Sequence, residues 1–196
     1  MKKLTLFLLV FVFTFNFVKA QQASWSFDVS HSKISFSVTH LVITEVIGHF
    51  SSFTGKVVSK SEDFVNSEIY FEIDSKSINT DNETRDNHLR SADFFEVEKY
   101  PKIIFKSKSF TKVKGNKYKL VGDFTMKDVT KTITLDVVYG GTIKDPWGNT
   151  KAGFKISGEV NRFDYNLKWN NLLETGGAVV GKTVKINCFV ELTKEK

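Results

Sequence analysis

The residues that could carry chemistry are few and lie far apart in the sequence. The four histidines are His31, His40, His49 and His88, and no two of them have the close spacing of a metal-binding motif such as HExxH. The chain also lacks a nucleophile elbow, a P-loop and a paired-carboxylate motif. The sequence therefore favours a protein with no catalytic residues, no metal and no cofactor. A hydrolytic or metal-dependent enzyme is the lesser alternative.

Charged side chains gather in the segment RDNHLRSADFF, which runs from Arg85 to Phe95. A planar guanidinium can bind a phosphate through two parallel hydrogen bonds, so Arg85 and Arg90 are candidates for holding a phosphate or pyrophosphate head group. Equally, both arginines could fix the segment to nearby acidic residues. His40 is a third candidate, because it ends an alternating run and could bond either a head group or a backbone carbonyl.

Cys188 is the only cysteine, so the chain forms no internal disulfide. A nucleophilic thiol is one interpretation of this residue. We favour the other, a small buried side chain, because an unpaired cysteine usually packs as an apolar residue. The fold is then stabilised by packing alone.

Around these residues, most of the chain alternates between apolar and polar side chains with a period of two, which is typical of β-strands. The alternating runs number about eight or nine. Turn-forming residues separate them, as in Lys114-Gly115-Asn116 and in the segment from Asp145 to Asn149. The pattern predicts an all-β protein whose successive antiparallel hairpins form an up-and-down barrel of about eight strands, with a sandwich as the alternative.

The phenylalanine content bears on what such a barrel encloses. The chain has 19 phenylalanines, and beyond the N-terminal segment they recur on one face of nearly every strand. An eight-stranded barrel is either filled by its side chains or holds one small ligand. Gly122 and Gly158 remove side chains from inward positions, which would leave room for a ligand. A filled core is the alternative.

One segment breaks the alternation and predicts a short helix over residues 80–90. Thr80 or Asp81 can cap its start, and Glu83 lies three residues after Thr80, as a capping box requires. A helix with an apolar underside and a polar top suits a lid across the end of a barrel. The residues that supply this underside are Leu89, Phe94 and Phe95.

Residues 1–20 have the features of a secretory signal peptide, namely two lysines, a short apolar run and small residues up to Ala20. We therefore expect cleavage near Ala20, one domain over residues 21–196, and a periplasmic or secreted location. A retained membrane anchor is the alternative, although the run is short for a span of roughly 20 residues. The lysines of the domain are scattered along strands, so no nucleic-acid patch is predicted.

Six stretches spread over most of the chain share a resemblance to one family. They are SKISFSVTHL, RDNHLRSADFFEVEKYPKIIF, GDFTMKDVTKTITLDV, DPWGNTKAGF, FDYNLKWN and VVGKTVKI. Their order and spacing from Trp25 to Leu192 resemble the YceI-like family, the polyisoprenoid-binding, lipocalin-like periplasmic proteins. The chain departs from the family pattern at Val42, where glycine is frequent, and at Tyr165-Asn166, where Phe-Gly is frequent.

The resemblance implies a lipocalin-like antiparallel barrel with an apolar tunnel and a short lid helix. Such a tunnel would hold a polyprenyl chain, an isoprenoid quinone, a fatty-acid-type lipid or another long-chain amphiphile, for transport or storage. A transient membrane contact and a homodimer are compatible with that role. The competing interpretation is a stress-related structural protein with a filled barrel and no ligand.

The resemblance and the alternation together predict which side chains line the tunnel. Arg85, Arg90 and His40 are the candidates for contact with a polar head group. The predicted lipid-binding residues are Phe36, Val38, His40, Phe71, Leu89, Phe94, Phe105, Phe124, Leu135, Phe154 and Ile156.

Overall fold

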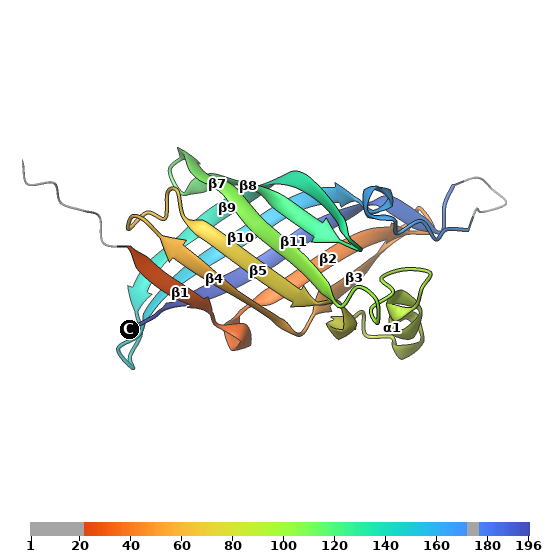
Figure 1. Ribbon diagram of the computed structural model, residues 1–196, viewed down its shortest axis with the longest axis horizontal. Coiled ribbons are helices and arrows are strands. Elements are labelled where there is room, and N and C mark those ends of the chain that lie inside the picture. Colours follow the sequence, from red (N-terminus) through yellow and green to blue (C-terminus); the bar gives the residue numbers. More distant parts are fainter. Residues whose placement is uncertain (1–21, 172–176) are drawn as a thin grey trace, which may run out of the picture.

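Every strand pair is antiparallel, and the sheet as a whole winds as a meander (Figure 1). The computed structural model describes residues 22–171 and 177–196. The predicted signal peptide lies outside these residues. The strands of the described ranges are β1 (Ala23–Phe27), β2 (Lys33–His40), β3 (Thr44–Phe50), β4 (Phe53–Ser59), β5 (Glu68–Asp74), β6 (Ile78–Asn79), β7 (Lys102–Lys114), β8 (Lys117–Met126), β9 (Val129–Lys144), β10 (Thr150–Asn161) and β11 (Val180–Lys194).

The helical elements are short. They are the α-helix α1 (Glu83–Arg90) and the 3-10 turns η1 (Val29–His31), η2 (Ser75–Ser77) and η3 (Arg162–Tyr165). Within the described ranges, no helix has the length and apolar character needed to cross a bilayer.

The eleven strands occupy eight positions in a closed ring, because each of the first three positions is split in two. Strands β1 and β2 make one position, β3 and β4 the next, and β5 with β6 the third. Accordingly β1 pairs with β4, while β2 pairs with β3. The last strand, β11, pairs with β2 over most of its length and with β1 near its end, which closes the ring. The predicted up-and-down barrel of about eight strands is confirmed, and a sandwich is excluded.

Local hydrogen bonds explain why two of these three positions are interrupted. The carboxylate of Asp28 accepts from the backbone N–H groups of Ser30 and His31 at 3.1 and 3.2 Å, and so begins η1. The carboxylate of Asp74 does the same for Lys76 at 2.9 Å and begins η2. Short polar side chains that bond nearby backbone groups compete with the strand ladder. The strands therefore stop at these residues and resume a few residues later.

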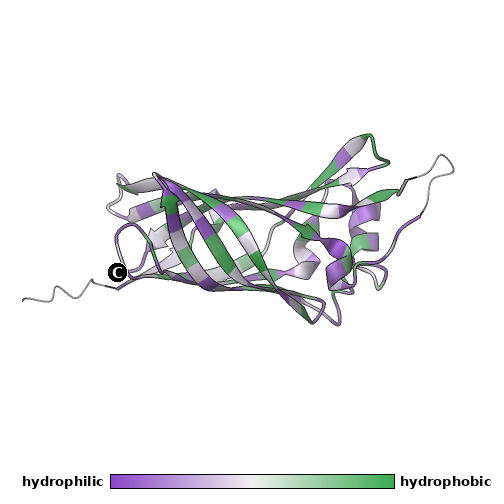
Figure 2. Cartoon of the chain, turned by 90° about the horizontal axis from the view of Figure 1, so that it is seen from above, coloured by the Kyte–Doolittle hydropathy of each residue, from purple (hydrophilic) through white to green (hydrophobic). Residues whose placement is uncertain are grey.

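The alternation in the sequence becomes an apolar interior and a charged exterior. Phe105 faces Phe124 across one pair of strands, and Ile156 faces both Val137 and Cys188 across two others. Figure 2 shows hydrophobic and hydrophilic residues alternating along the strands. The interior face therefore matches the period-two prediction.

The predicted turns are confirmed. Lys114 ends β7 and Lys117 begins β8, so the Gly115-Asn116 pair forms the hairpin turn. After β9, the carboxylate of Asp145 accepts from the N–H groups of Trp147 and Asn149 at 3.0 and 2.8 Å. This side chain fixes the turn that leads into β10.

The predicted cap of the helix is wrong by one or two residues. Asn82, not Thr80 or Asp81, is the N-cap, and its side-chain oxygen accepts from the backbone N–H of Arg85 at 2.9 Å. The hydroxyl of Thr80 instead donates to the Asp86 carboxylate at 2.5 Å. That bond is buried, and together with the Thr80 N–H, which donates to the same carboxylate at 2.9 Å, it ties Thr80 to the side of the helix and leaves the cap to Asn82.

The expectation that Gly122 and Gly158 leave room inside the barrel is also wrong. A methyl group built on Gly122 would overlap the ring of Phe105 and the carbonyl oxygen of Lys106, and one on Gly158 would overlap the side chain of Leu135. Large neighbours already fill the space that these glycines vacate. The glycines therefore allow close packing and do not widen the interior.

Replacing Gly122 with alanine should lower the free energy of unfolding by about 1–3 kcal/mol, the usual cost of overpacking. Urea denaturation followed by circular dichroism measures this loss. Gly153→Ala is the matched control, because no atom lies within 4 Å of the added methyl group, and it should change stability by less than about 0.5 kcal/mol. Equal stability of both variants would contradict the packing explanation.

Candidate functional site, an apolar tunnel

The barrel encloses an apolar cavity of about 240 Å³. Every strand except β6 contributes to its wall, as do α1, η3 and the loop between β4 and β5. Strand β11 lines it from Val180 to Leu192, nearly the whole length of the strand. Among the wall residues, only Ser35, Ser67 and Arg162 are polar. The cavity is therefore a long, narrow tunnel rather than a pocket in one side of the barrel.

Most of the residues predicted to bind lipid form part of this wall. Their contact with a ligand stays a prediction, but their position inside the tunnel is as expected. The ten that line it are Phe36, Val38, Phe71, Leu89, Phe94, Phe105, Phe124, Leu135, Phe154 and Ile156.

The eleventh, His40, does not line the tunnel. It sits at the end of β2, paired with Thr44 of β3 and Val180 of β11. Period-two alternation puts it on the same side of β2 as Val38, but the wall that β2 contributes ends at Val38. Its partner Val180 does line the tunnel, so His40 lies beside the end of the cavity, and its contact with a ligand or head group stays a prediction.

Aromatic side chains seal one end of the tunnel. Phe64, in the loop between β4 and β5, is 2% exposed, and its ring centroid lies 5.0 Å from that of Trp25, 5.1 Å from Phe154 and 5.6 Å from Tyr139. Its backbone is held in the left-handed region at φ 62°. The hydroxyl of Ser67 fixes the loop by donating to the Phe64 carbonyl at 2.6 Å. No sequence period marks Phe64, because it lies in a loop.

The opposite end is covered by α1 and the residues that follow it (Figure 1). Phe95 packs edge-on against Phe50 with 6.0 Å between ring centroids. Phe94 lies 5.2 Å from Trp169, and His88 of α1 lies 5.0 Å from the same indole. We call the residues from Glu83 to Val97 the lid segment. Its apolar underside faces the tunnel, as the sequence predicted.

The two arginines of the lid segment bond backbone groups beside it. Arg90 donates from Nε to the carbonyl of Lys76 and from Nη2 to the carbonyl of Ile78, both at 2.9 Å. Arg85 donates from Nε to the Thr80 hydroxyl and from Nη2 to the Thr80 carbonyl, both at 2.7 Å. Neither lines the tunnel, so the structure accounts for both as anchors. Contact with a head group stays a prediction.

Lys127 fastens the lid segment from the other side of the barrel. It lies in the turn between β8 and β9, and its ammonium donates to the carbonyl of Phe94 at 2.7 Å. The same nitrogen is 3.8 Å from the Glu96 carboxylate, and the side chain is only 9% exposed. A short, shielded hydrogen bond from a charged donor is stronger than an exposed ion pair. The lid segment is thus held at both edges.

Arg162 is the charged member of the tunnel wall, and it is 2% exposed. It donates from Nε to Gly181 at 2.8 Å, from Nη1 to Leu167 and Trp169 at 2.5 and 2.8 Å, and from Nη2 to Val180 at 3.1 Å. All four acceptors are backbone carbonyls. Across the part of the chain that the structure describes, no carboxylate pairs with it. Burial lowers the pKa of this guanidinium, which nevertheless stays charged.

Sequence reasoning missed Arg162, although one signal was present. The inward positions of β10 are Phe154, Ile156, Gly158 and Val160, and the next step of two reaches Arg162. Polar residues are usually taken to end an alternating run. Here the series of inward-facing positions continues past the end of β10 to Arg162, the first residue of η3.

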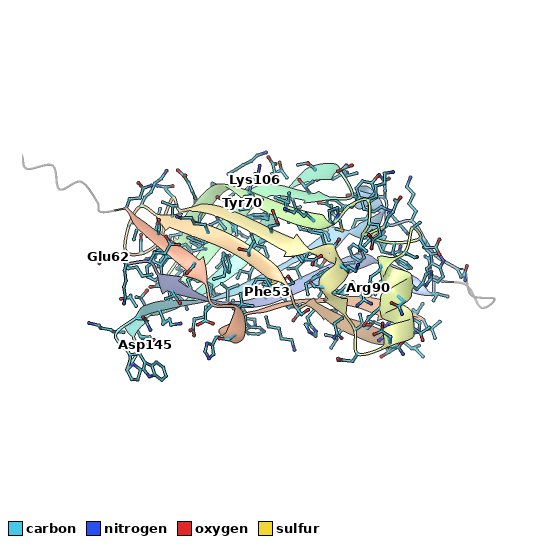
Figure 3. All side chains as sticks on the ribbon, turned by 60° about the horizontal axis from the view of Figure 1, so that its bottom comes forward. Phe53, Glu62, Tyr70, Arg90, Lys106 and Asp145 are labelled. Carbon is cyan, nitrogen blue, oxygen red and sulfur yellow. The ribbon has the colours of Figure 1, made fainter. Side chains whose placement is uncertain are left out.

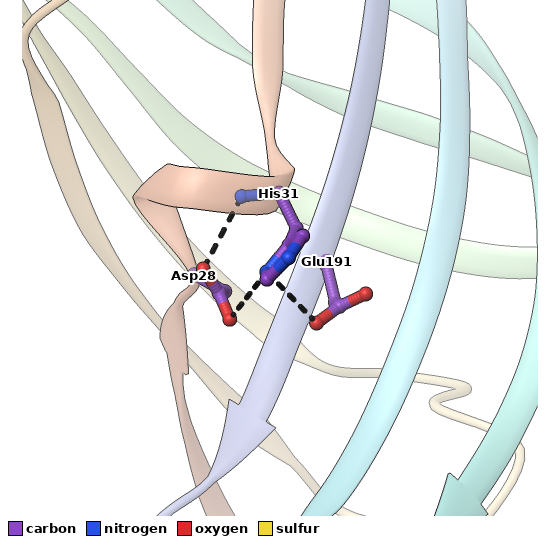
Figure 4. A group of neighbouring side chains, drawn as sticks. All are labelled: Asp28, His31 and Glu191. Atoms are coloured by element: carbon purple, nitrogen blue, oxygen red, sulfur yellow. Dashed lines mark hydrogen bonds and ion pairs between the residues drawn. The ribbon is translucent and has the colours of Figure 1, made fainter. Parts of the chain in front are cut away.

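Outside the tunnel, Asp28, His31 and Glu191 bring three metal-type ligands together (Figure 4). His31 Nδ1 lies 3.1 Å from the Asp28 carboxylate and 3.7 Å from that of Glu191. The ammonium of Lys151 lies closer, 2.6 Å from Asp28 and 3.1 Å from Glu191. This contact holds the pKa of Asp28 well below its usual range. Lys151 thus supplies the cation that these carboxylates need, and a metal would have to displace it.

Comparison with known proteins agrees with this geometry. A YceI-like domain matches residues 25–192. A UPF0312 protein of Staphylococcus aureus (strain N315) is 39% identical over 171 residues, which cover 87% of this chain and 97% of that protein. Burkholderia cenocepacia BcnA superposes with a TM-score of 0.73 at 21% identity, over 84% of this chain and 98% of that chain.

A further solved structure has the same fold. A polyisoprenoid-binding domain from Saccharophagus degradans, implicated in plant cell wall breakdown, has a TM-score of 0.64 at 15% identity, over 88% of this chain and 99% of that chain. At these identities, the two solved structures show the fold alone.

The fold and the tunnel define a class of closed antiparallel barrels with one sealed end, one covered end and an apolar bore. Within that class, the chain belongs to the YceI-like domain family, because the family match spans residues 25–192 and the staphylococcal relative is 39% identical. The predicted resemblance is confirmed.

Replacing Lys127 with alanine should loosen the lid segment without unfolding the barrel. The variant loses a hydrogen bond from a charged donor worth about 1.5 kcal/mol, so we expect roughly tenfold faster backbone amide exchange in residues 94–97. Hydrogen–deuterium exchange with mass spectrometry measures this rate. Lys108→Ala removes an exposed pair with Asp123 and should leave the segment unchanged. Identical exchange in both variants would show that Lys127 does not fasten it.

Cys188 lines the tunnel and is buried, as the sequence predicted for its only cysteine. Burial raises the pKa of this thiol to about 11. Because only the thiolate reacts, alkylation by iodoacetamide at pH 8 should be about 100-fold slower than in the urea-unfolded chain, and it should speed up with rising pH. Intact-mass analysis of timed samples measures both rates. Equal rates in the folded and unfolded chain would place the thiol in water.

Proposed function

We propose that this protein binds one long-chain lipid in the tunnel, and that binding rather than catalysis is its function. The observation that carries the proposal is the wall itself, which is apolar around the whole barrel apart from Ser35, Ser67 and Arg162. Each methylene group moved from water into such a wall contributes about 0.8 kcal/mol. A chain of several isoprene units or a long acyl chain would therefore bind tightly through non-directional contacts.

Membership of the YceI-like family supports this proposal, as does the name of the Saccharophagus degradans domain, which describes that protein as polyisoprenoid-binding. The candidate ligands are a polyprenyl chain, an isoprenoid quinone and a fatty-acid-type lipid. An apolar wall discriminates poorly between chains of similar girth. Among chains of similar size, the polar end of the ligand must therefore supply the selectivity.

The polar end of the ligand would lie near Arg162. This guanidinium borders the covered end of the tunnel through its bonds to Leu167 and Trp169, and Trp169 packs against the lid segment. Its Nη2 group uses one N–H on Val180, and a second N–H of that group remains for a ligand oxygen. We therefore expect an amphiphile with an oxygen-bearing head rather than a pure hydrocarbon.

The setting of this activity is part of the proposal. The signal-peptide features of residues 1–20 favour a periplasmic or secreted protein. A lipid that leaves a membrane for such a compartment needs shielding from water. Transport or storage of the lipid follows from that need.

The deciding experiment combines extraction with probe uptake. The protein is purified from its own compartment without detergent, and its organic extract is analysed by mass spectrometry for a stoichiometric long-chain lipid. In parallel, an apolar fluorescent probe is titrated into extracted protein. We expect a bound lipid in the first measurement and saturable uptake in the second. An empty extract together with no uptake would favour the filled structural barrel.

A blocked tunnel makes the test specific. Ile156→Trp puts an indole into the bore, and we expect probe affinity to fall at least about tenfold because a tunnel of about 240 Å³ cannot hold both. Val138→Trp, on the outer face of β9 at 39% exposure, is the control and should bind as the wild type does. Thermal melts establish that each variant is folded. Equal binding by both would place the probe outside the tunnel.

A further inference from the structure

The hairpin between β2 and β3 ends in an apolar tip that folding does not explain. Val42 and Ile43, in the turn, are 65% and 85% exposed, and Leu41 beside them is 36% exposed. Two steps of two along β3 from Ile43, on the same outer face, lies Ile47 at 68% exposure. We call these four residues the apolar tip. None of the three turn residues lines the tunnel, and Ile47 faces outward.

The backbone of the tip is strained. Leu41 and Val42 both have positive φ, 52° and 68°, and the turn closes with a hydrogen bond from Ile43 N–H to the His40 carbonyl at 3.2 Å. Positive φ at two successive residues favours Gly or Asn, because a side chain there is strained and a β-branched one most of all. Valine here weakens the fold, and with 65% of its surface exposed its side chain recovers little by packing.

The apolar tip borders the covered end of the tunnel. The N–H of Leu41 donates to the carbonyl of Val179 at 2.9 Å, and the next residue, Val180, belongs to the tunnel wall. In Figure 2 the hydrophobic tip of this hairpin projects beyond the barrel at the same end as α1. Phe64 seals the far end, so a lipid that enters or leaves lengthwise would pass beside the tip.

Charge around the tip suits an anionic surface. Glu45, two residues after Ile43, bonds Lys185 at 2.5 Å, and this contact lowers the pKa of the Glu45 carboxyl. Lys182 is exposed in β11 next to Gly181, whose backbone lies against Thr39 of β2. Within residues 22–171 and 177–196, no carboxylate pairs with Lys182. An exposed apolar tip gains free energy by entering the interfacial layer of a bilayer, and a nearby cation adds attraction to anionic lipid.

Size argues against a second protein chain as the occupant. A specific dimer interface takes about 20–30 residues from each partner. The apolar tip offers four, on a convex hairpin end. A fluid lipid interface needs no complementary groove and accepts such a shape.

We propose that the apolar tip docks this protein on an anionic phospholipid membrane, with the covered end of the tunnel facing the lipid. The proposal rests on the proposed function, since it assigns the surface through which a tunnel-bound lipid is exchanged. Docking brings Ile43 and Val42 into the interfacial layer. It thereby places the lid segment, rather than the sealed end, against the bilayer.

Flotation with vesicles tests the docking itself. Vesicles of phosphatidylcholine and phosphatidylglycerol are mixed with wild-type protein, Ile43→Asp, Val42→Asn and Ile143→Asp, then centrifuged through a density gradient. We expect at least fivefold less bound protein for the first two variants. Val42→Asn should at the same time melt at a higher temperature, because asparagine tolerates positive φ. This opposite shift separates docking from folding.

Ile143→Asp is the matched control. Ile143 is 67% exposed and precedes the Asp145 turn, which lies at the opposite end of the barrel from Arg90 of the lid segment (Figure 3). It should float as the wild type does. Loss of flotation in Ile143→Asp but not in Ile43→Asp would overturn the proposal, because the other end would then be the docking surface. A change of sedimentation coefficient in Ile43→Asp without loss of flotation would identify a second copy of the chain as the occupant.

Two readouts keep this proposal distinct from the tunnel proposal. Probe uptake in vesicle-free solution measures the tunnel, and the rate of probe extraction from vesicles measures docking. We expect Ile43→Asp to retain solution uptake and to extract the probe at least fivefold more slowly. Normal extraction by Ile43→Asp would reject docking and leave the tunnel intact. Absence of solution uptake by the wild type would reject the tunnel instead.

Discussion

Closure of the ring by β11 is the constraint on which the rest of the structure depends. This strand pairs with β10 on one side and with both β2 and β1 on the other. A closed ring leaves no unpaired edge, and it separates an inside from an outside for every strand. Only then does a simple two-residue period in the sequence produce a continuous apolar bore.

The ring alone would be an open tube, and its two ends are finished by different means. One end is filled by side chains, with Phe64 buried among Trp25, Tyr139 and Phe154. The other is covered by a segment whose underside is apolar but whose attachment is polar, through Arg90 and Lys127. Hydrogen bonds to single carbonyls can break without disturbing the barrel, so the lid segment can open locally. The aromatic cluster can move only if the residues packed around it move as well. The two ends of the barrel therefore differ, one being permanently closed and the other able to open.

The barrel and most of its wall could be predicted because period-two alternation is a local property of each strand. Errors arose where contacts outside these simple patterns decide. Thr80 matches a helix cap by spacing, yet its hydroxyl bonds the Asp86 side chain and Asn82 caps the helix. Gly122 suggested space, yet Phe105 occupies that space from the neighbouring strand. Phe64 and Arg162 were missed because one lies in a loop and the other extends an inward face with a charge, and no single-strand pattern reveals either.

A tunnel with one permanently closed end limits the length of the chain that it can accept. Because Phe64 cannot recede without disturbing the rings packed around it, the depth available to a hydrocarbon chain is set by the barrel and not by the ligand. Chains shorter than that depth leave apolar wall uncovered, and longer ones must push their last carbons against the lid segment. Preference among ligands would then follow the reach of the chain more than its branching or saturation.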